Sequence, residues 1–220
     1  MRQNNLEVTI DNIRAAHKAR RDEILSRLAE FQEIWENASD ARLFEEMAFC
    51  IFTAGASARM GLRSIKAIKK LLLKGEQKEI EEALVGVHRY PAARAGYVIT
   101  TRNFLQTDCR LRLRKRLEGF EDSTERRDWV AREKGIKGLG YKESSHFLRN
   151  IGLRGYGILD KHILRSMAEL GVIESPQPPT TRTKYLKTEQ SLKEFARDVK
   201  IDFDELDLVL WSMKTGEVLK

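Results

Sequence analysis

The residues whose types and spacing suggest chemistry lie in the segment 136–160, IKGLGYKESSHFLRNIGLRGYGILD. Its tripeptide Gly138-Leu139-Gly140 is a glycine turn that comes just before a helical pattern. Successive backbone amides at a turn that opens a helix form a binding site for a phosphate group. The segment therefore predicts a binding site for the backbone of a nucleic acid. The simpler alternative is an ordinary pair of helices joined by a glycine turn.

Lys142 is the candidate nucleophile of this segment, because it follows the glycine turn directly. It falls in the first turn of the predicted helix, where the positive end of the helix dipole disfavours a charged ammonium. A neutral amine beside a sugar carbon is able to form a Schiff base. The simpler alternative is a lysine that contacts a phosphate.

Asp160 ends the glycine-rich loop GLRGYGILD and precedes a predicted helix, where an aspartate is a common N-cap. If it faces a lysine, the same carboxylate stabilises the positive charge that develops on a deoxyribose as its base departs. His146 lies one helical turn beyond Lys142 on the same face, so it either lines a pocket or faces solvent.

Composition narrows the class of protein. The 220 residues are 41% hydrophobic, which is enough for a core and excludes a disordered chain. The net charge of +7 suits a polyanionic partner, although a basic solvated surface explains it equally well. Cys50 and Cys109 do not have the clustered spacing of a zinc or iron–sulfur site, so no side-chain metal site is expected. The N-terminus lacks an apolar signal region and no stretch has membrane-spanning length, which predicts a cytoplasmic protein without membrane contact.

Hydrophobic periodicity predicts an all-α fold. The apolar run after the capping pair Ser39-Asp40 is expected to be a central buried helix through Phe52. The segment 110–116, RLRLRKR, fits either an alternating strand or a basic helix face, and either a solvated charge run or a DNA contact. One or two helices are predicted over 10–34. Others are predicted over 58–73, 76–86, 92–106, 124–135, 142–151, 160–171, 188–199 and 202–214, the last ending at Gly216.

The hairpin, the glycine-rich loop and the acid after it together resemble the helix-hairpin-helix DNA glycosylase superfamily. The hairpin residues that carry the resemblance are Ile136, Gly138, Leu139, Gly140, Ser144, Phe147 and Leu148. In the bifunctional members a lysine at the position of Lys142 is the nucleophile. Lys137 departs from the pattern, since it stands where a proline usually precedes the hairpin glycine. The branches that carry a four-cysteine iron–sulfur cluster after the core fit poorly, because no cysteine follows Cys109.

The segment FCIFTAGASARMG and the ending LWSMKTGEVLK resemble the second, archaeal-type class of 8-oxoguanine DNA glycosylase/AP lyase, which some bacteria also contain. The resemblance is strongest over 43–61, 136–166 and 207–220. It implies two helical subdomains with the active site between them. We therefore expect residues 1–220 to form a single catalytic unit, with N- and C-terminal helices at about 1–55 and 172–220. A helical subdomain at about 56–171 carries the hairpin.

The resemblance also implies roles for residues outside the hairpin. Trp211 matches a base-stacking aromatic of the family, and the terminal carboxylate of Lys220 reaches the base pocket. Without the resemblance, Trp211 is read as a core tryptophan on one helix with Leu208. Arg59 fills the gap left in the duplex or contacts the opposite base, unless it binds a phosphate instead.

The function implied is a bifunctional repair enzyme that excises 8-oxoguanine through a lysine Schiff base and cleaves the strand 3′ to the abasic site by β-elimination. The partner expected is double-stranded DNA containing oxidised guanine, bound by a monomer associated with the nucleoid. No cofactor is expected, although backbone carbonyls at the 138–140 turn are suited to a monovalent ion, as in some relatives. The alternatives are a glycosylase/lyase for other oxidised bases and a non-catalytic hairpin module that binds DNA.

Overall fold

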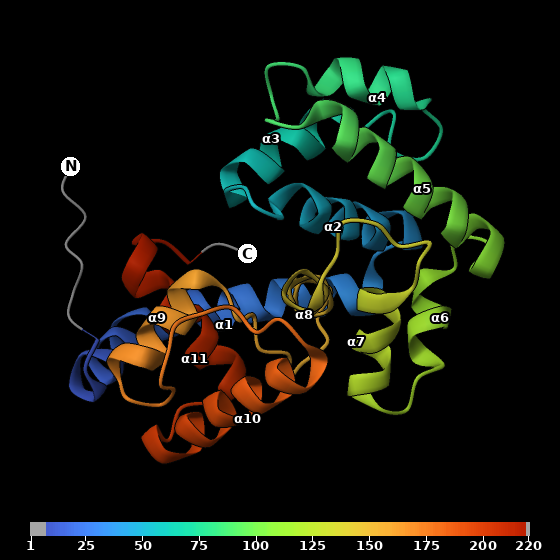
Figure 1. Ribbon diagram of the computed structural model, residues 1–220. Helices are drawn as coiled ribbons and strands as arrows, with labels where there is room; N and C mark the ends of the chain where they lie inside the picture. Colours follow the sequence, from blue (N-terminus) through green and yellow to red (C-terminus); the bar gives the residue numbers. More distant parts are fainter. Residues whose placement is uncertain (1–7, 219–220) are drawn as a thin grey trace. The chain divides into compact units, whose positions relative to one another are not determined.

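The computed structural model describes residues 8–218, which form eleven helices and no strand, so the all-α prediction is confirmed (Figure 1). Within this range no helix is long and apolar enough to cross a membrane. The helices are α1 (Ile10–Asn37), α2 (Asp40–Thr53), α3 (Ala58–Ile68), α4 (Gln77–Leu84), α5 (Pro91–Cys109), α6 (Leu113–Glu118), α7 (Ser123–Arg132), α8 (Tyr141–Asn150), α9 (Lys161–Glu169), α10 (Arg182–Val199) and α11 (Phe203–Thr215).

The helices group into two compact units. Unit 1 contains the described residues 8–32 and 152–218, and unit 2 contains residues 33–151. The helix α1 begins in unit 1 and ends in unit 2. These boundaries lie earlier along the chain than the expected ones near residues 55 and 171, because α2 packs with the hairpin helix α8 and α9 packs with α11.

The helix α2 is the centre of unit 2. Ser39 caps it, accepting a hydrogen bond from the Arg42 amide at 3.3 Å, as the sequence predicts. All residues from Met47 to Thr53 are buried, and the helix contacts α3, α5, α6 and α8. The expectation of a central buried helix is therefore confirmed, and its apolar surface positions the hairpin helix.

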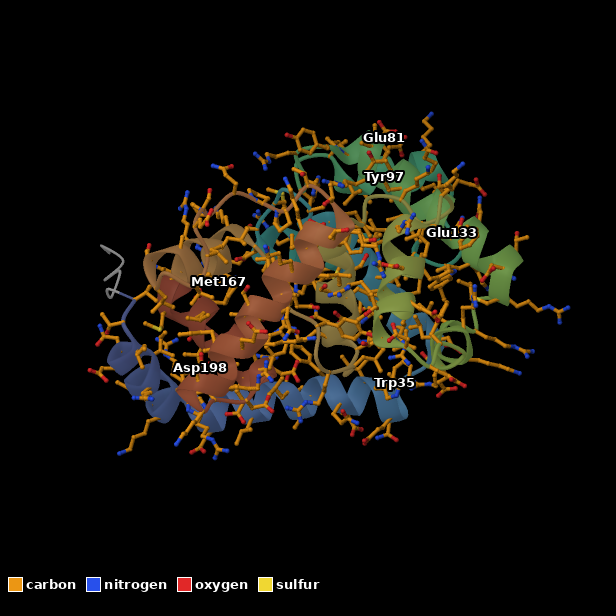
Figure 2. The ribbon with its side chains drawn as sticks, turned by 60° about the horizontal axis from the view of Figure 1, so that its bottom comes forward. Trp35, Glu81, Tyr97, Glu133, Met167 and Asp198 are labelled. Atoms are coloured by element: carbon orange, nitrogen blue, oxygen red, sulfur yellow. The ribbon has the colours of Figure 1, made fainter. Side chains whose placement is uncertain are left out.

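The basic segment 110–116 is neither a strand nor a single helix face. Arg110 and Leu111 adopt left-handed backbone conformations (φ 53° and 56°), and the short helix α6 begins only at Leu113. Within α6, the Arg114 amide donates to Asp40 Oδ1 at 2.7 Å. The Arg114 guanidinium lies 5.1 Å from the ring centroid of Trp35, a side chain labelled at the end of α1 in Figure 2. Arg114 is therefore part of the packing of unit 2.

Unit 1 is built around α11, which packs against both α9 and α10. The first part of α1 is tied to it by His17, whose Nε2 lies 2.6 Å from Glu205 Oε2. The helix ends as predicted at Gly216, which has a left-handed φ of 84°. The largest differences from the predicted helix bounds are in α3, which is shorter, and in α10, which begins at Arg182, six residues before the predicted start at 188, because Thr181 caps it there.

Candidate active site

The helix-hairpin-helix element consists of α7, the turn at 133–140 and α8. The four apolar residues predicted to hold its helices together, Ile136, Leu139, Phe147 and Leu148, are all buried. Because α7 and α8 also contact each other along their lengths, the turn is attached to a packed pair of helices. The packed helices of the hairpin therefore support the turn residues 138–140.

Gly138 meets two separate requirements at the turn. Its φ is +78°, a conformation that side chains rarely adopt. A Cβ atom here would also lie 2.7 Å from Cδ2 of Tyr97, the α5 residue labelled in Figure 2. The guanidinium of Arg94, also on α5, lies next to the same position. The turn is thus fitted against α5 by a backbone approach that only glycine permits.

Lys137, the departure from the family's usual proline, makes a contact that proline cannot make. Its backbone amide donates to Oγ1 of Thr101, a fully buried residue of α5, at 2.9 Å. Proline lacks this N–H group. In this chain the backbone at position 137 is therefore fixed by a hydrogen bond to α5, and not by the ring of a proline.

The end of α2 is capped by basic side chains that the sequence reading did not single out. His88 Nε2 lies 3.0 Å from the carbonyl oxygen of Phe52, while Arg94 and Arg89 donate to the carbonyls of Ala54 and Gly55. Free carbonyls at a helix C-terminus carry partial negative charge, which explains the attraction for cations. Burial is the main cause that lowers the pKa of His88 below its usual value. The only sequence signal was an unremarkable cluster of basic residues.

Lys142 occupies the second position of α8, after the N-cap Gly140. Its Nζ lies 2.9 Å from Oε1 of Glu143, and the two side chains are 28% and 15% exposed. The Gly140 carbonyl accepts the Ser144 amide at 2.9 Å, so the helix begins directly at the turn. The predicted nucleophile is therefore accessible and already paired with a carboxylate that the sequence reading missed.

His146 and Arg59, the other site residues predicted in unit 2, have different environments. His146 is only 8% exposed, and its ring meets the ring of Phe49 edge-on, with centroids 5.7 Å apart. The alternative in which it faces solvent is therefore wrong. Arg59 is exposed in the first turn of α3, which Ser57 caps. Its predicted role on DNA stays a prediction.

Asp160, in unit 1, is the N-cap of α9, as the simpler alternative predicted. Its Oδ1 accepts the amides of His162 (2.8 Å) and Ile163 (2.9 Å). No hydrogen bond from a described residue reaches Oδ2. Capping therefore occupies one carboxylate oxygen and leaves the other for chemistry, so the two roles are compatible.

The glycine-rich loop before Asp160 is held by carboxylates from α10 and α11. Each of these carboxylates belongs to a buried residue, and each accepts a backbone amide of the loop. The pairs are Gly155 with Asp204 (3.0 Å), Gly157 with Glu189 (2.8 Å) and Ile158 with Asp207 (3.4 Å). Tyr185 adds a bond to the Gly157 carbonyl at 2.7 Å. The loop that delivers Asp160 is thus fixed by residues far from it in sequence.

Trp211 stands out within α11. Every other residue from Asp204 to Met213 is buried, whereas Trp211 is partly exposed. The simpler reading of a core tryptophan does not account for this exception, and its stacking role stays a prediction. Lys220, the other base-recognition residue predicted near the C-terminus, lies outside the described residues.

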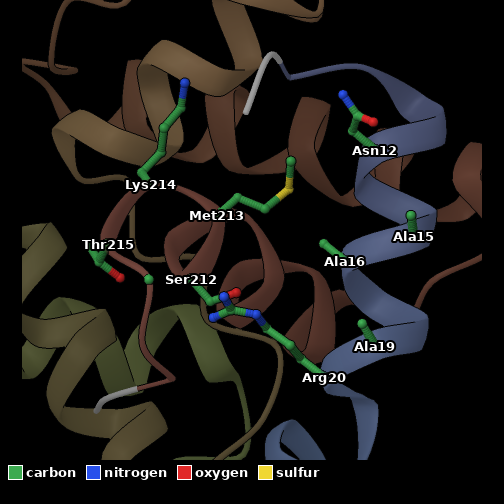
Figure 3. A pocket seen from close by; sticks show the side chains of 10 residues that line it. Asn12, Ala15, Ala16, Ala19, Arg20, Ser212, Met213, Lys214 and Thr215 are labelled. Carbon is green, nitrogen blue, oxygen red and sulfur yellow. The ribbon is translucent and has the colours of Figure 1, made fainter. Parts of the chain in front are cut away.

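A cavity of about 550 Å³ lies in unit 1 between α1 and the end of α11 (Figure 3). Ala15, Ala16 and Ala19 line it on α1, and Ser212 and Met213 line it on α11. Neither Trp211 nor Asp160 lines it. The described site residues predicted in this unit therefore do not form its lining. Among residues 8–218 no group of three or more His, Cys, Asp or Glu side chains is arranged to hold a metal ion.

The predicted residues divide between the two units. The turn Gly138-Leu139-Gly140, Lys142, His146 and Arg59 belong to unit 2, while Asp160 and Trp211 belong to unit 1. Each half thus carries one of the two candidate catalytic side chains, an amine in one and a carboxylate in the other.

Comparison with known proteins places this arrangement in a family. Residues 24–201 match the model of a family described as 8-oxoguanine DNA glycosylase. An 8-oxoguanine DNA glycosylase/AP lyase of Korarchaeum cryptofilum is 38% identical over 201 residues, which cover 91% of each protein. A protein of the same name from Fusobacterium nucleatum is 33% identical over 213 residues, covering 96% of this chain and 97% of the relative.

Solved structures agree with the sequence comparison. The Methanocaldococcus jannaschii 8-oxoguanine glycosylase/lyase, crystallised with a 15mer DNA containing 8-oxoguanine, superimposes with a TM-score of 0.87 at 36% identity. The match covers 96% of this chain and 99% of that one. The 8-oxoguanine DNA glycosylase of Thermotoga maritima gives a TM-score of 0.86 at 32% identity, covering 96% of this chain and 98% of that one. With its hairpin, its glycine-rich loop and these relatives, the chain belongs to the 8-oxoguanine DNA glycosylase family.

Proposed function

We propose that this protein excises 8-oxoguanine from double-stranded DNA and then cleaves the strand at the resulting abasic site. The observation that carries the proposal is the accessible Lys142 in the first turn of the hairpin helix, directly after the Gly138–Gly140 turn. Turn amides at a helix N-terminus bind a phosphate, so the DNA backbone is held next to the amine. The likeness to proteins named 8-oxoguanine DNA glycosylase/AP lyase supports the choice of lesion.

The chemistry begins with the Lys142 amine attacking C1′ of the damaged nucleotide. The new N–C1′ bond replaces the bond from C1′ to N9, and the base departs with that electron pair. The sugar ring then opens to an imine as O4′ takes a proton. Loss of a C2′ proton and of the 3′ phosphate by β-elimination cuts the strand, and water finally releases Lys142. None of these reaction steps uses a cofactor.

Asp160 supplies negative charge during base departure. Oδ1 is fixed by the two amides of α9, so the carboxylate cannot rotate freely, and Oδ2 remains for the chemistry. A preorganised charge of this kind stabilises developing positive charge on the sugar without reorganisation. The enzyme acts as a monomer on an extruded base, with Trp211 stacking on that base and Lys220 contributing to its recognition. Arg59 contacts the opposite strand.

Borohydride trapping tests the proposal. Reduction of the imine leaves a stable covalent adduct between protein and DNA, which is visible as a shifted band on a denaturing gel. We expect an adduct with duplexes containing 8-oxoguanine, and none with the same duplex containing guanine. Lys142→Gln should abolish the adduct while damaged-DNA binding is retained. An adduct formed by Lys142→Gln would mean that another amine is the nucleophile.

The choice of lesion is tested in the same assay. A duplex with thymine glycol in place of 8-oxoguanine asks whether the enzyme prefers an oxidised pyrimidine. An adduct with thymine glycol alone would reject 8-oxoguanine as the substrate. Absence of an adduct with both lesions, and with a preformed abasic site, would leave only a DNA-binding module.

A further inference from the structure

Glu143 is placed to do more than balance the charge of a surface lysine. On an α-helix, consecutive side chains point about 100° apart, and ion pairs normally join residues three or four positions apart. Here neighbouring residues pair at 2.9 Å, Lys142 Nζ to Glu143 Oε1. Both side chains must therefore bend to the same side of the helix start. The contact is a specific arrangement and does not follow from helix geometry alone.

The pair is also less exposed than the Lys69–Glu45 pair of the same unit. The Lys69–Glu45 pair is 3.8 Å long, and its lysine side chain is 69% exposed, against 28% for Lys142. A shorter and less hydrated pair interacts more strongly, because water screens it less. The Lys142–Glu143 pair is therefore the stronger of these two ion pairs.

Glu143 also lies over the turn that is proposed to bind DNA. Its Oε2 is 3.4 Å from the position that a Cβ of Gly140 would take. Burial is the main cause that lowers the pKa of Arg94, and the Glu143 charge acts in the opposite direction. The carboxylate therefore stands among three positive features: the Lys142 ammonium, the Arg94 guanidinium and the N-terminus of α8.

Other titratable groups of unit 2 at this helix are engaged elsewhere. Asp128 of α7 accepts from the Tyr141 hydroxyl at 3.0 Å. Arg127 of α7 donates to Ser145 at 3.2 Å. Glu46 of α2 binds Arg42 and Asn150. The remaining neighbours on α5 are Arg94 and Tyr97, which lie 5.5 Å from each other as a cation–π pair. Glu143 is therefore the carboxylate in contact with the amine.

We propose that Glu143 is the proton acceptor that converts the Lys142 ammonium into the attacking amine, an inference that rests on the proposed function. The proton moves from Nζ to Oε1, which leaves a neutral amine with a free electron pair and a neutral carboxylic acid. The neutral amine is thereby formed beside the turn that is proposed to bind the DNA backbone.

The test compares Glu143→Gln with wild type in single-turnover excision of 8-oxoguanine over a pH series. The amide keeps the size of the side chain but cannot take the proton. We expect excision and borohydride trapping at a preformed abasic site to slow by about 100-fold near neutral pH, the scale of general base catalysis. The rates should recover toward wild type as the pH rises, since hydroxide then removes the proton.

Glu79→Gln is the matched control. Glu79 occupies the third position of α4, as Glu143 does in α8, and its Oε2 accepts the Glu76 amide at 2.7 Å. The change removes the same charge from the same helical position of the same unit. Its rates should equal those of wild type at every pH. Thermal unfolding of both variants checks that each remains folded.

Three outcomes for Glu143→Gln would overturn the inference. Rates equal to wild type at all pH values would show that the carboxylate takes no proton. Faster reaction than wild type near neutral pH would show that it only restrains the lysine. A deficit that does not recover with pH would show a structural role. Failure of the proposed function is read separately, from absence of trapping in wild type or its persistence in Lys142→Gln.

Discussion

The hairpin turn at 133–140 and the loop at 152–160 present the two candidate catalytic side chains in different ways. Both are rich in glycine, and each leads into the helix whose first turn carries or follows the reactive group. The turn is fitted by steric contact with α5, where Gly138 meets Tyr97 and Arg94. In the loop, by contrast, backbone amides donate hydrogen bonds to buried carboxylates of α10 and α11.

The conformation of the turn and that of the loop therefore depend on different features of the structure. The turn needs a particular backbone conformation and a small residue at the position where it meets α5. The loop needs acceptors that come from helices many residues later in the chain, and those carboxylates in turn need the loop amides to compensate their burial. Damage at Gly138 should therefore be caused by bulk, and damage to the part of the loop from Gly155 to Ile158 by loss of charge or acceptor.

The largest effect is expected for Gly138→Ala, which adds bulk where the turn approaches α5. The left-handed φ and the contact with Tyr97 at 2.7 Å together should lower the free energy of unfolding by about 3 kcal/mol. DNA affinity should fall as well, because the turn amides shift. Urea unfolding followed by circular dichroism measures the first quantity, and fluorescence anisotropy with labelled duplex measures the second.

Gly155→Ala is the matched change in the loop. Its φ of +85° is similar, but a Cβ there would meet nothing within 4 Å. Only the conformational strain of about 1 kcal/mol should remain. Equal losses for the two alanine variants would contradict the view that steric fit distinguishes the turn.

The next effect concerns the loop's acceptors. Glu189→Ala leaves the Gly157 amide without its 2.8 Å partner in a buried place, which should cost about 2 kcal/mol. Glu189→Gln retains an acceptor oxygen and should cost less than about 1 kcal/mol. Because Asp160 follows this loop, the alanine variant should also excise 8-oxoguanine more slowly in single-turnover assays, while its DNA affinity through the hairpin is unchanged. Loss of affinity equal to that of Gly138→Ala would remove the distinction between the two regions.

The smallest effect is a difference in acid sensitivity. Burial lowers the pKa of both His88, in the unit of the hairpin, and His162, beside the loop. The unfolded chain therefore binds more protons than the folded one, and stability is lost as the pH falls below about 6.5 through the lower folded-state pKa values. His88 is buried and accepts the Tyr90 amide through Nδ1, which protonation would block.

Comparison of urea midpoints at neutral pH and near the lower folded-state pKa values tests this difference. His88→Gln should reduce the acid-induced loss more than His162→Gln does, since His162 is only partly buried. A larger reduction in His162→Gln would place the acid-sensitive element beside the loop and not at the end of α2.

Much of the fold was predictable because its signals are local. Helical periodicity, the Ser39 cap of α2 and the glycine end of α11 each depend on residues a few positions apart. The division into units depends on which apolar faces meet, as those of α2 and α8 do, and residue spacing alone does not determine this.

The sequence alone determined the hairpin, the candidate nucleophile Lys142 and the cap at Asp160, because a glycine turn, a helix start and an N-cap are written in adjacent residues. It could not show that Glu143 bends onto Lys142, since neighbouring helical side chains normally diverge. Nor could it show that Glu189 and Asp204 hold the loop before Asp160. Hydrogen bonds between segments distant in sequence exist only once the helices have packed, so tertiary structure decided what supports each candidate catalytic group.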